Sequence, residues 1–245
     1  IKGDSYGNGG FWAPQIYKQN GKYYMAYTAD EHIAIAESDS PLGPFTQKVH
    51  KAISGPGRQI DPFIFKDKNG KYYLYHVRLQ NGNRIFVAEM KSDLSDIIEN
   101  TAVECIAATE PWEDTANVPW PVAEGPTVVK QGGLYYLIYC TNDFRNIDYA
   151  VGYATSSSPM GPWKKYAGNP VISRKNTGYN GTGHGDLFTA KDGKLYYVLH
   201  THKSNNNNKG RRKTAIIEVS FSKDKPAIFS ADEKTFRFLQ TANFN

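Results

Sequence analysis

Three ionisable side chains and one indole occupy matching places in the sequence. Trp12, Asp61, Glu124 and His184 each lie nine positions before a glycine that opens a short aromatic segment. Two carboxyl groups of this kind can serve as a proton donor and as its charged partner in acid–base catalysis. An indole beside polar groups suits a sugar, whose apolar C–H face can lie on the ring while its hydroxyls form hydrogen bonds. The residue types favour carbohydrate chemistry if the fold brings the four positions together.

Each acidic residue also has a simpler interpretation. Asp61 precedes a proline, which is common in turns, and Glu124 precedes Gly-Pro, which suits a solvated loop end. For either residue alone the turn interpretation would be preferred. The shared spacing of both acids, with Trp12 and His184 at the same distance, favours a common site.

The elements that must position these residues repeat along the chain. Glycine followed by an aromatic segment recurs at residues 21–25, 70–74, 133–137 and 193–197, at intervals of about 50 to 60 residues that are typical of a propeller blade with loop insertions. An apolar run precedes each glycine, and further strands are predicted over residues 32–37, 84–89 and 150–154. Each repeat is therefore predicted to be an antiparallel sheet of three or four strands.

Composition supports an all-β protein, because 17 Tyr and 12 Phe favour pleated strands over helices. Small sheets bury their faces when they are arranged radially around a channel, so the repeats predict a β-propeller with about four blades in this chain. A sandwich would not explain repetition of a whole unit. We expect residues 1–245 to form a single propeller domain, in which the asparagine run 205–208 is a loop of the last blade.

Several classes of protein are excluded by composition. No run of about 18 apolar residues is present, so no membrane helix is expected. The net charge of +5 is spread along the chain apart from the basic run 209–213, which argues against a nucleic-acid partner. Two cysteines, Cys105 and Cys140, do not make a disulfide scaffold, and both two free thiols and one bridge remain open.

Four segments carry a resemblance to a known family. Residues 11–17 (FWAPQIY), 60–63 (IDPF), 124–126 (EGP) and 181–185 (GTGHG), in this order, resemble the signature segments of family 43 glycoside hydrolases. The resemblance covers nearly the whole chain. It implies a five-bladed β-propeller and an inverting enzyme that acts on plant cell-wall polysaccharides or oligosaccharides, with an exo-acting arabinofuranosidase or xylosidase as the expected activity. It also implies a protein that is secreted or periplasmic, although this chain carries no export signal.

The resemblance also assigns roles to single residues. Glu124 matches the general acid, and Asp61 matches the carboxylate that holds this acid and raises its pKa, as a like charge does. Phe11 and Trp12 match a substrate-binding segment. His184 matches an axial histidine at the bottom of the pocket, often near a bound calcium ion or water, so a structural calcium is the one cofactor considered and none is required.

A late arginine of the family that reaches the active site matches Arg212, although a solvated basic loop explains residues 211–213 equally well.

The general base of the family belongs to a further Asp-Pro segment in the first blade, and no such segment precedes Trp12. We therefore expect the base to lie outside this chain, and the chain alone to hydrolyse glycosides negligibly. We also expect an open edge in the ring, closed by its neighbouring blades, by a second copy of the chain or by residues 221–245, with 235–239 as the best candidate.

Two other functions remain open. One is a non-catalytic propeller that binds carbohydrate. The other is a fructosidase or sialidase, but a sialidase needs an arginine cluster, and Arg58, Arg78, Arg84 and Arg145 share no common spacing. Residues 144–146 and 58–59 are the expected contributors to sugar selection.

Overall fold

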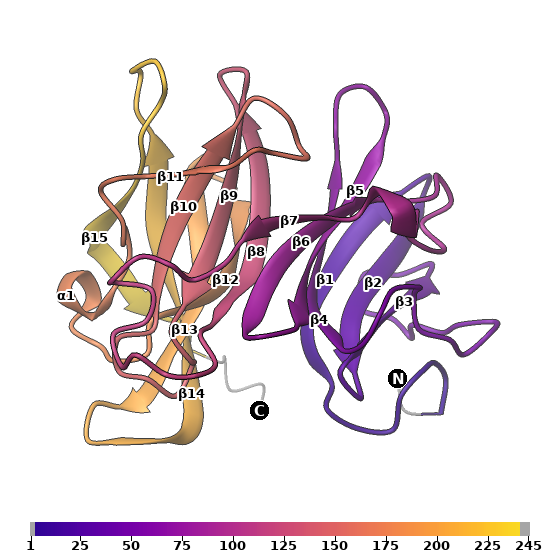
Figure 1. The fold of residues 1–245 in the computed structure, drawn as a ribbon, viewed down its shortest axis with the longest axis horizontal. Coiled ribbons are helices and arrows are strands. Elements are labelled where there is room, and N and C mark those ends of the chain that lie inside the picture. The colour runs from indigo at the N-terminus through magenta and orange to yellow at the C-terminus, as the bar shows by residue number, and fades with distance from the viewer. Residues whose placement is uncertain (1–2, 241–245) are drawn as a thin grey trace.

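The computed structural model describes residues 3–240, and it consists of four small antiparallel sheets (Figure 1). The first sheet contains β1 (Trp12–Gln19), β2 (Lys22–Ala29) and β3 (His32–Ser38), and the second contains β4 (Gln59–Lys66), β5 (Tyr72–Leu79), β6 (Asn83–Glu89) and β7 (Val103–Ile106). The third contains β8 (Ala123–Gln131), β9 (Leu134–Thr141), β10 (Ala150–Ser156) and β11 (Lys164–Lys165), and the fourth contains β12 (Gly183–Thr189), β13 (Leu195–Ser204), β14 (Asn207–Phe221) and β15 (Phe229–Phe238). A helix, α1 (Arg174–Thr177), and a 3-10 turn (Glu99–Thr101) complete the elements.

The sequence repeat corresponds to these sheets. Strands follow one another in chain order within every sheet, so each sheet is a meander built from hairpins. Gly21 and Gly133 stand in the first hairpin turns of their sheets with φ of 81° and 89°, a conformation that glycine adopts without steric cost. The strands predicted over 32–37, 84–89 and 150–154 are confirmed as β3, β6 and β10. The all-β propeller prediction with four blades is likewise confirmed.

The first strand of each sheet lies next to the first strand of the following sheet. Contacts run from β1 to β4, from β4 to β8 and from β8 to β12. Equivalent positions of the four strands therefore face a common axis. This arrangement brings residues that are far apart in the sequence to one place.

Tyrosine side chains fill the spaces between the sheets. Tyr75 and Tyr139 belong to the cluster between the second and third sheets, and Tyr136 and Tyr197 to the cluster between the third and fourth. Burial of such a side chain contributes about 1.5–3 kcal/mol. The phenol groups are not left unpaired, since Tyr75 donates to the Pro159 carbonyl at 2.6 Å and Tyr136 to the Ala227 carbonyl at 2.7 Å.

The long connection between β7 and β8 is fixed by a buried carboxylate. Glu113 is fully buried, and it accepts hydrogen bonds from the Thr109 and Glu110 amides, the Tyr139 hydroxyl and the Lys165 ammonium at 2.5–2.8 Å. Four donors, one of them charged, compensate the cost of burying this charge. The connection is therefore held firmly against the third sheet.

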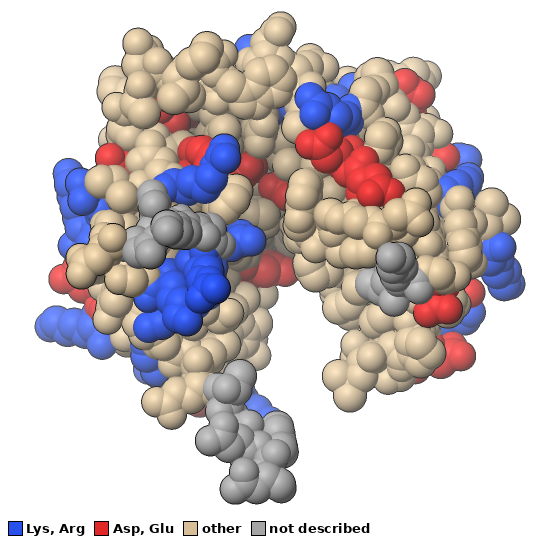
Figure 2. Space-filling model, turned by 90° about the horizontal axis from the view of Figure 1, so that it is seen from below, with Lys and Arg blue, Asp and Glu red and all other residues tan. Residues whose placement is uncertain are grey.

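Seen from below relative to Figure 1, the molecule has a notch between two lobes, and acidic side chains lie at the inner end of this notch (Figure 2). Every second residue of β1 is exposed, and Ile16 has 44% of its surface accessible.

Residues 235–238, expected to cover an open edge of the ring, form part of β15, which pairs with β14 as the outer strand of the fourth sheet. That expectation is wrong, because the segment completes its own blade; residues 241–245 lie outside the described residues.

Cys105 and Cys140 are both free thiols. None of the helices in residues 3–240 is long and apolar enough to cross a membrane.

Candidate active site

The site residues stand where the innermost strands depart from regular pairing. β1, β4, β8 and β12 each carry an irregularity, between Trp12 and Gln15, Ile60 and Phe63, Glu124 and Thr127, and Gly183 and Asp186. The residue that follows the last paired position has a positive φ in all four strands: Ala13, Asp61, Gly125 and His184. A bulge of this kind bends the strand and re-aims its side chains, and such bulges are frequent next to active sites.

This pairing corrects the register inferred from the sequence. Glu124 pairs with Cys140 as the last residue before its bulge, whereas Asp61 and His184 are the first residues within theirs. The shared spacing of nine residues therefore does not mark equivalent positions in the four strands. Glu124 and Trp12 lie one residue before the positions that Asp61 and His184 occupy. The hairpin turns span residues 20–21 and 132–133 in two sheets but 67–71 and 190–194 in the others, so the glycines used for counting are not equivalent.

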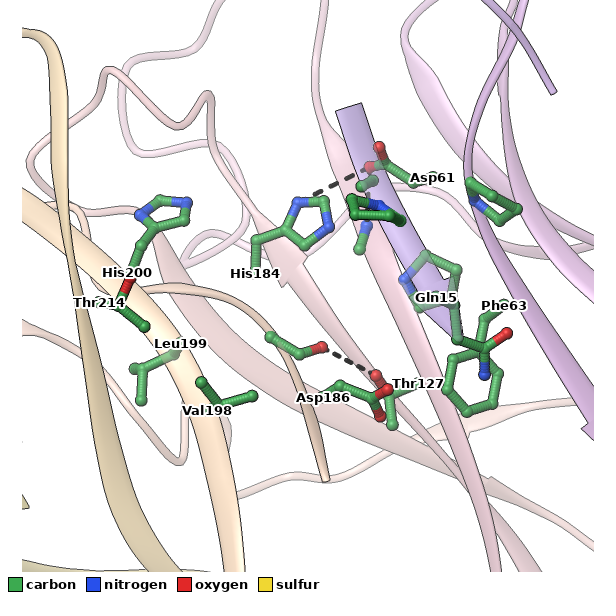
Figure 3. Close-up of a pocket in the computed structure, with 16 residues that line it drawn as sticks. Gln15, Asp61, Phe63, Thr127, His184, Asp186, Val198, Leu199, His200 and Thr214 are labelled. Carbon is green, nitrogen blue, oxygen red and sulfur yellow. Dashed lines mark hydrogen bonds and ion pairs between the residues drawn. The ribbon is translucent and has the colours of Figure 1, made fainter. Parts of the chain in front are cut away.

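Three of the four predicted residues nevertheless meet. One oxygen of Asp61, one oxygen of Glu124 and one ring nitrogen of His184 all lie within 4.8 Å of one another. His184 Nδ1 is 3.8 Å from Asp61 Oδ2, and Figure 3 shows the imidazole pointing toward this carboxylate. The carboxylates are nearly withdrawn from solvent, with 5% of Asp61 and 8% of Glu124 exposed.

The two aromatic candidates lie apart from this cluster. Ala13 and Gln15 of β1 line the pocket, while Trp12 is 46% and Phe11 is 39% exposed. The Phe11 ring lies 6.2 Å from that of Tyr27. The indole is therefore an exposed side chain of the first sheet and does not join the carboxylates.

Glu124 is held by residues that the sequence interpretation missed. Asn83 Nδ2 donates to Glu124 Oε2 at 3.0 Å, and the Tyr149 hydroxyl donates to Oε1 at 2.8 Å. The Trp120 indole N–H donates to Asn83 Oδ1 at 2.9 Å and so fixes which way the amide points. None of these three residues recurs at the spacing of the repeat, so only their contacts identify them.

The electrostatic environment favours a proton on Glu124. Burial, followed by the charge of Asp61, raises the pKa of Glu124, and the bonds from Tyr149 and Asn83 offset this only in part. Burial also raises the pKa of Asp61, but the Gly125 amide, which donates to Oδ2 at 3.2 Å, and the charge of Arg212 both stabilise its ionised form. Burial lowers the pKa of His184. The pKa of both carboxyl groups is raised to about 7, so the buried pair retains a proton toward neutral pH, and the charge of Asp61 favours its presence on Glu124.

Arg212 faces the site from β14. Successive residues of a strand point to opposite faces, so Arg212 is separated from Arg211 and Lys213. Its guanidinium lies 4.9 Å from the centre of the Phe144 ring, and its charge acts on Asp61, His184 and His200. The Lys213 ammonium lies instead over the Phe238 ring at 5.0 Å.

A cavity of about 280 Å³ adjoins the cluster (Figure 3). Asp61 and His184 lie at one end of its wall, and Thr127, Asp186 and His200 also line it. Burial raises the pKa of Asp186 to about 6. The cavity is large enough for one monosaccharide unit, and its walls offer both carboxyl groups and imidazoles for hydrogen bonds.

The three converging groups are a poor fit for a calcium ion held directly by the protein. Calcium takes about six to eight oxygen ligands, whereas this set has two carboxylates and one imidazole nitrogen. Both oxygens of Glu124 and one oxygen of Asp61 already accept hydrogen bonds. The arrangement fits proton transfer better than metal binding.

Comparisons with known proteins agree with this geometry. The profile described as "Glycosyl hydrolases family 43" matches residues 2–226. A "Beta-xylosidase" of Xylanibacter ruminicola is 27% identical over 238 residues, covering 86% of this chain and 71% of that protein. An "Extracellular exo-alpha-(1->5)-L-arabinofuranosidase" of Streptomyces avermitilis is 25% identical over 201 residues, covering 75% of this chain and 40% of that protein.

Among solved structures, the "Endo-1,4-beta-xylanase" of Bacteroides thetaiotaomicron superposes with a TM-score of 0.86 and 42% identity, over 94% of this chain and 78% of that one. The family profile, which matches residues 2–226, includes all four segments that carry Trp12, Asp61, Glu124 and His184. A buried acid pair on a propeller axis and a profile match over most of the sequence lead to one conclusion. The chain belongs to glycosyl hydrolases family 43.

Proposed function

We propose that this chain carries the proton-donating part of an inverting glycosidase site that releases xylose or arabinofuranose units from plant cell-wall polysaccharides or oligosaccharides. The observation that carries the proposal is the pair formed by Glu124 and Asp61, which are buried together so that the pKa of each is raised to about 7. In this reaction Glu124 gives its proton to the glycosidic oxygen as the bond to the leaving group breaks. Asp61 keeps Glu124 protonated at neutral pH until that step.

Asp61 is too close to Glu124 to serve also as the base. Inverting glycosidases separate their two catalytic carboxyl groups by roughly 6.5–9.5 Å to leave room for a water molecule. The nearest oxygens of Asp61 and Glu124 lie within 4.8 Å of one another. We therefore assign Asp61 to tuning and orientation, and we assign water activation to another group. The inverting outcome itself rests on the resemblance to the family.

The proposed sugar specificity and the proposed exo mode of cleavage are taken from the names of similar proteins. Similar proteins are named as a xylosidase and as an exo-acting arabinofuranosidase, and both pentoses suit a cavity of about 280 Å³. Because one of these relatives is named as extracellular, we propose a secreted or periplasmic location. We further propose that the reaction needs no cofactor, that the partner is a carbohydrate and not a nucleic acid or a membrane, and that any self-association uses the exposed side of β1.

The leaving group provides the test of Glu124. In Glu124→Gln, hydrolysis of an unactivated disaccharide should fall by about a hundred- to ten-thousand-fold, because the departing alkoxide needs a proton. A dinitrophenyl glycoside should lose much less, since its leaving group departs without one. Rates would be measured with added formate, which can act as an external base. Glu104→Gln, which changes an exposed carboxylate on β7, is the matched control. An equal loss on both substrates would contradict the assignment.

A second candidate is a propeller that binds carbohydrate without cleaving it. The observation in its favour is that Ala13 occupies the bulge position of β1 that Asp61 occupies in β4, so the first sheet offers no carboxylate there. Calorimetry with xylose and arabinose, together with a nitrophenyl glycoside assay with and without formate, separates the two functions. Saccharide binding without turnover under either condition would support the binding protein.

A further inference from the structure

We propose that Trp120 is the platform for the sugar on the leaving-group side of the scissile bond, and that this sugar is neutral. The inference rests on the proposed role of Glu124 as the acid. It concerns a second cavity, of about 560 Å³, that is separate from the one beside Asp61 and His184. Its lining residues are Val118, Pro119, Trp120, Asp143, Arg145 and Asn146.

Trp120 is connected to the acid through one side chain. Its indole N–H donates to Asn83 Oδ1 at 2.9 Å, and the same amide donates to Glu124 Oε2 at 3.0 Å. A general acid must touch the oxygen of the group that leaves. The leaving sugar therefore lies beside Glu124, and Trp120 is the exposed aromatic residue joined to Glu124 through one side chain.

Trp120 is exposed but held in place. Trp120 has 40% of its surface accessible and Val118 has 41%, although both belong to a connection anchored by the buried Glu113. The backbone N–H of Asn83 also donates to the Pro121 carbonyl at 2.9 Å, and this bond fixes the chain next to Trp120. A rigid aromatic surface loses little conformational entropy on binding.

The cavity beside Trp120 is also lined by a charged pair, Asp143 and Arg145. Arg145 binds Asp143 through two bonds, Nε to Oδ1 at 2.6 Å and Nη2 to Oδ2 at 2.7 Å. This bidentate pair cancels its own charge but keeps polar edges that hydroxyl groups can reach. The opposite wall supplies an indole, on which the C–H face of a sugar ring can lie. Such a site suits a neutral pentose or hexose better than a uronic acid.

The experiment compares a short ligand with a long one by titration calorimetry. Xylose fills only the pocket beside Asp61, whereas xylotetraose also reaches Trp120. We expect Trp120→Ala to weaken xylotetraose binding by about ten-fold more than xylose binding, because any effect of losing the bond to Asn83 is shared by both ligands. Trp120→Phe keeps a ring and should retain most of the affinity for xylotetraose. Phe188→Ala, which removes an aromatic residue that is 39% exposed at the far end of β12, should change neither ligand.

The outcomes separate this inference from the proposed function. Unchanged xylotetraose affinity in Trp120→Ala, with xylose still bound, would overturn the platform and leave the role of the pocket intact. A parallel loss of both ligands in Trp120→Ala and Trp120→Phe would also overturn it, since the residue would then act on the pocket or on folding. Failure of the unsubstituted chain to bind either saccharide would overturn both proposals.

Discussion

The buried Glu124 should make folding stability depend on pH in a direction opposite to that of most carboxyl groups. Burial and the charge of Asp61 raise the pKa of Glu124 from 4.5 to about 7. Between these values the folded protein holds a proton that the unfolded chain has released. The stabilisation from this proton is complete below pH 4.5 and is lost as the pH rises through 7. Since each pH unit corresponds to 1.36 kcal/mol, the contribution of Glu124 is about 3 kcal/mol.

The perturbation that isolates this effect is Glu124→Gln. The amide has nearly the same shape but does not titrate, and its new hydrogen bonds with Asn83 and Tyr149 cost the same free energy at every pH. The difference in unfolding free energy between the variant and the unsubstituted chain should therefore change by about 3 kcal/mol in favour of the variant between pH 4.5 and pH 8. Because the charge of Asp61 acts on Glu124, the comparison reports the titration of Glu124 together with its interaction with Asp61.

The assay is urea denaturation followed by circular dichroism at several pH values between 4.5 and 8. Asp61→Asn provides a second comparison, because loss of its charge removes part of what raises the pKa of Glu124. The pH dependence of stability should be weaker in this variant than in the unsubstituted chain. Parallel stability curves for the unsubstituted chain and Glu124→Gln would refute the reasoning, since Glu124 would then have the same proton affinity in the folded and the unfolded states.

Three further predictions follow from the structure. Glu113→Gln should destabilise the fold by about 3–5 kcal/mol, measured by urea denaturation, because the partly buried Lys165 loses the charged partner that the fully buried Glu113 supplies. Arg212→Ala should weaken saccharide binding in calorimetry and Arg211→Ala should not, because only Arg212 faces the carboxylates; equal effects would place both residues on a solvated loop. The 245-residue chain should hydrolyse nitrophenyl glycosides negligibly until formate is added, because Ala13 leaves β1 without a carboxylate at the site. Full activity without formate would instead locate the base within the chain. Asp186, which lines the pocket, would then be replaced next, as Asp186→Asn.

The architecture could be predicted from the sequence because it depends on local signals that repeat. Glycine at a hairpin turn and an aromatic strand after it are short-range features, and four copies of them leave few arrangements other than a ring of sheets. The same repetition placed Asp61, Glu124 and His184 near one axis. Their convergence within 4.8 Å follows from the register of the innermost strands, which hairpin lengths and hydrophobic alternation largely determine.

Only the tertiary structure decided how these residues work together. Counting along the chain cannot detect a bulge or a longer turn, so the register of Glu124 was misplaced by one residue, and Trp12 was expected in the pocket although it is an exposed side chain of the first sheet. The residues that orient Glu124 come from β6, from the loop before β10 and from the connection before β8, with sequence separations of 25 residues for Tyr149 and 41 for Asn83. The elevated pKa of Glu124 likewise comes from burial and from a neighbouring charge, and both are properties of the assembled sheets that no local pattern encodes.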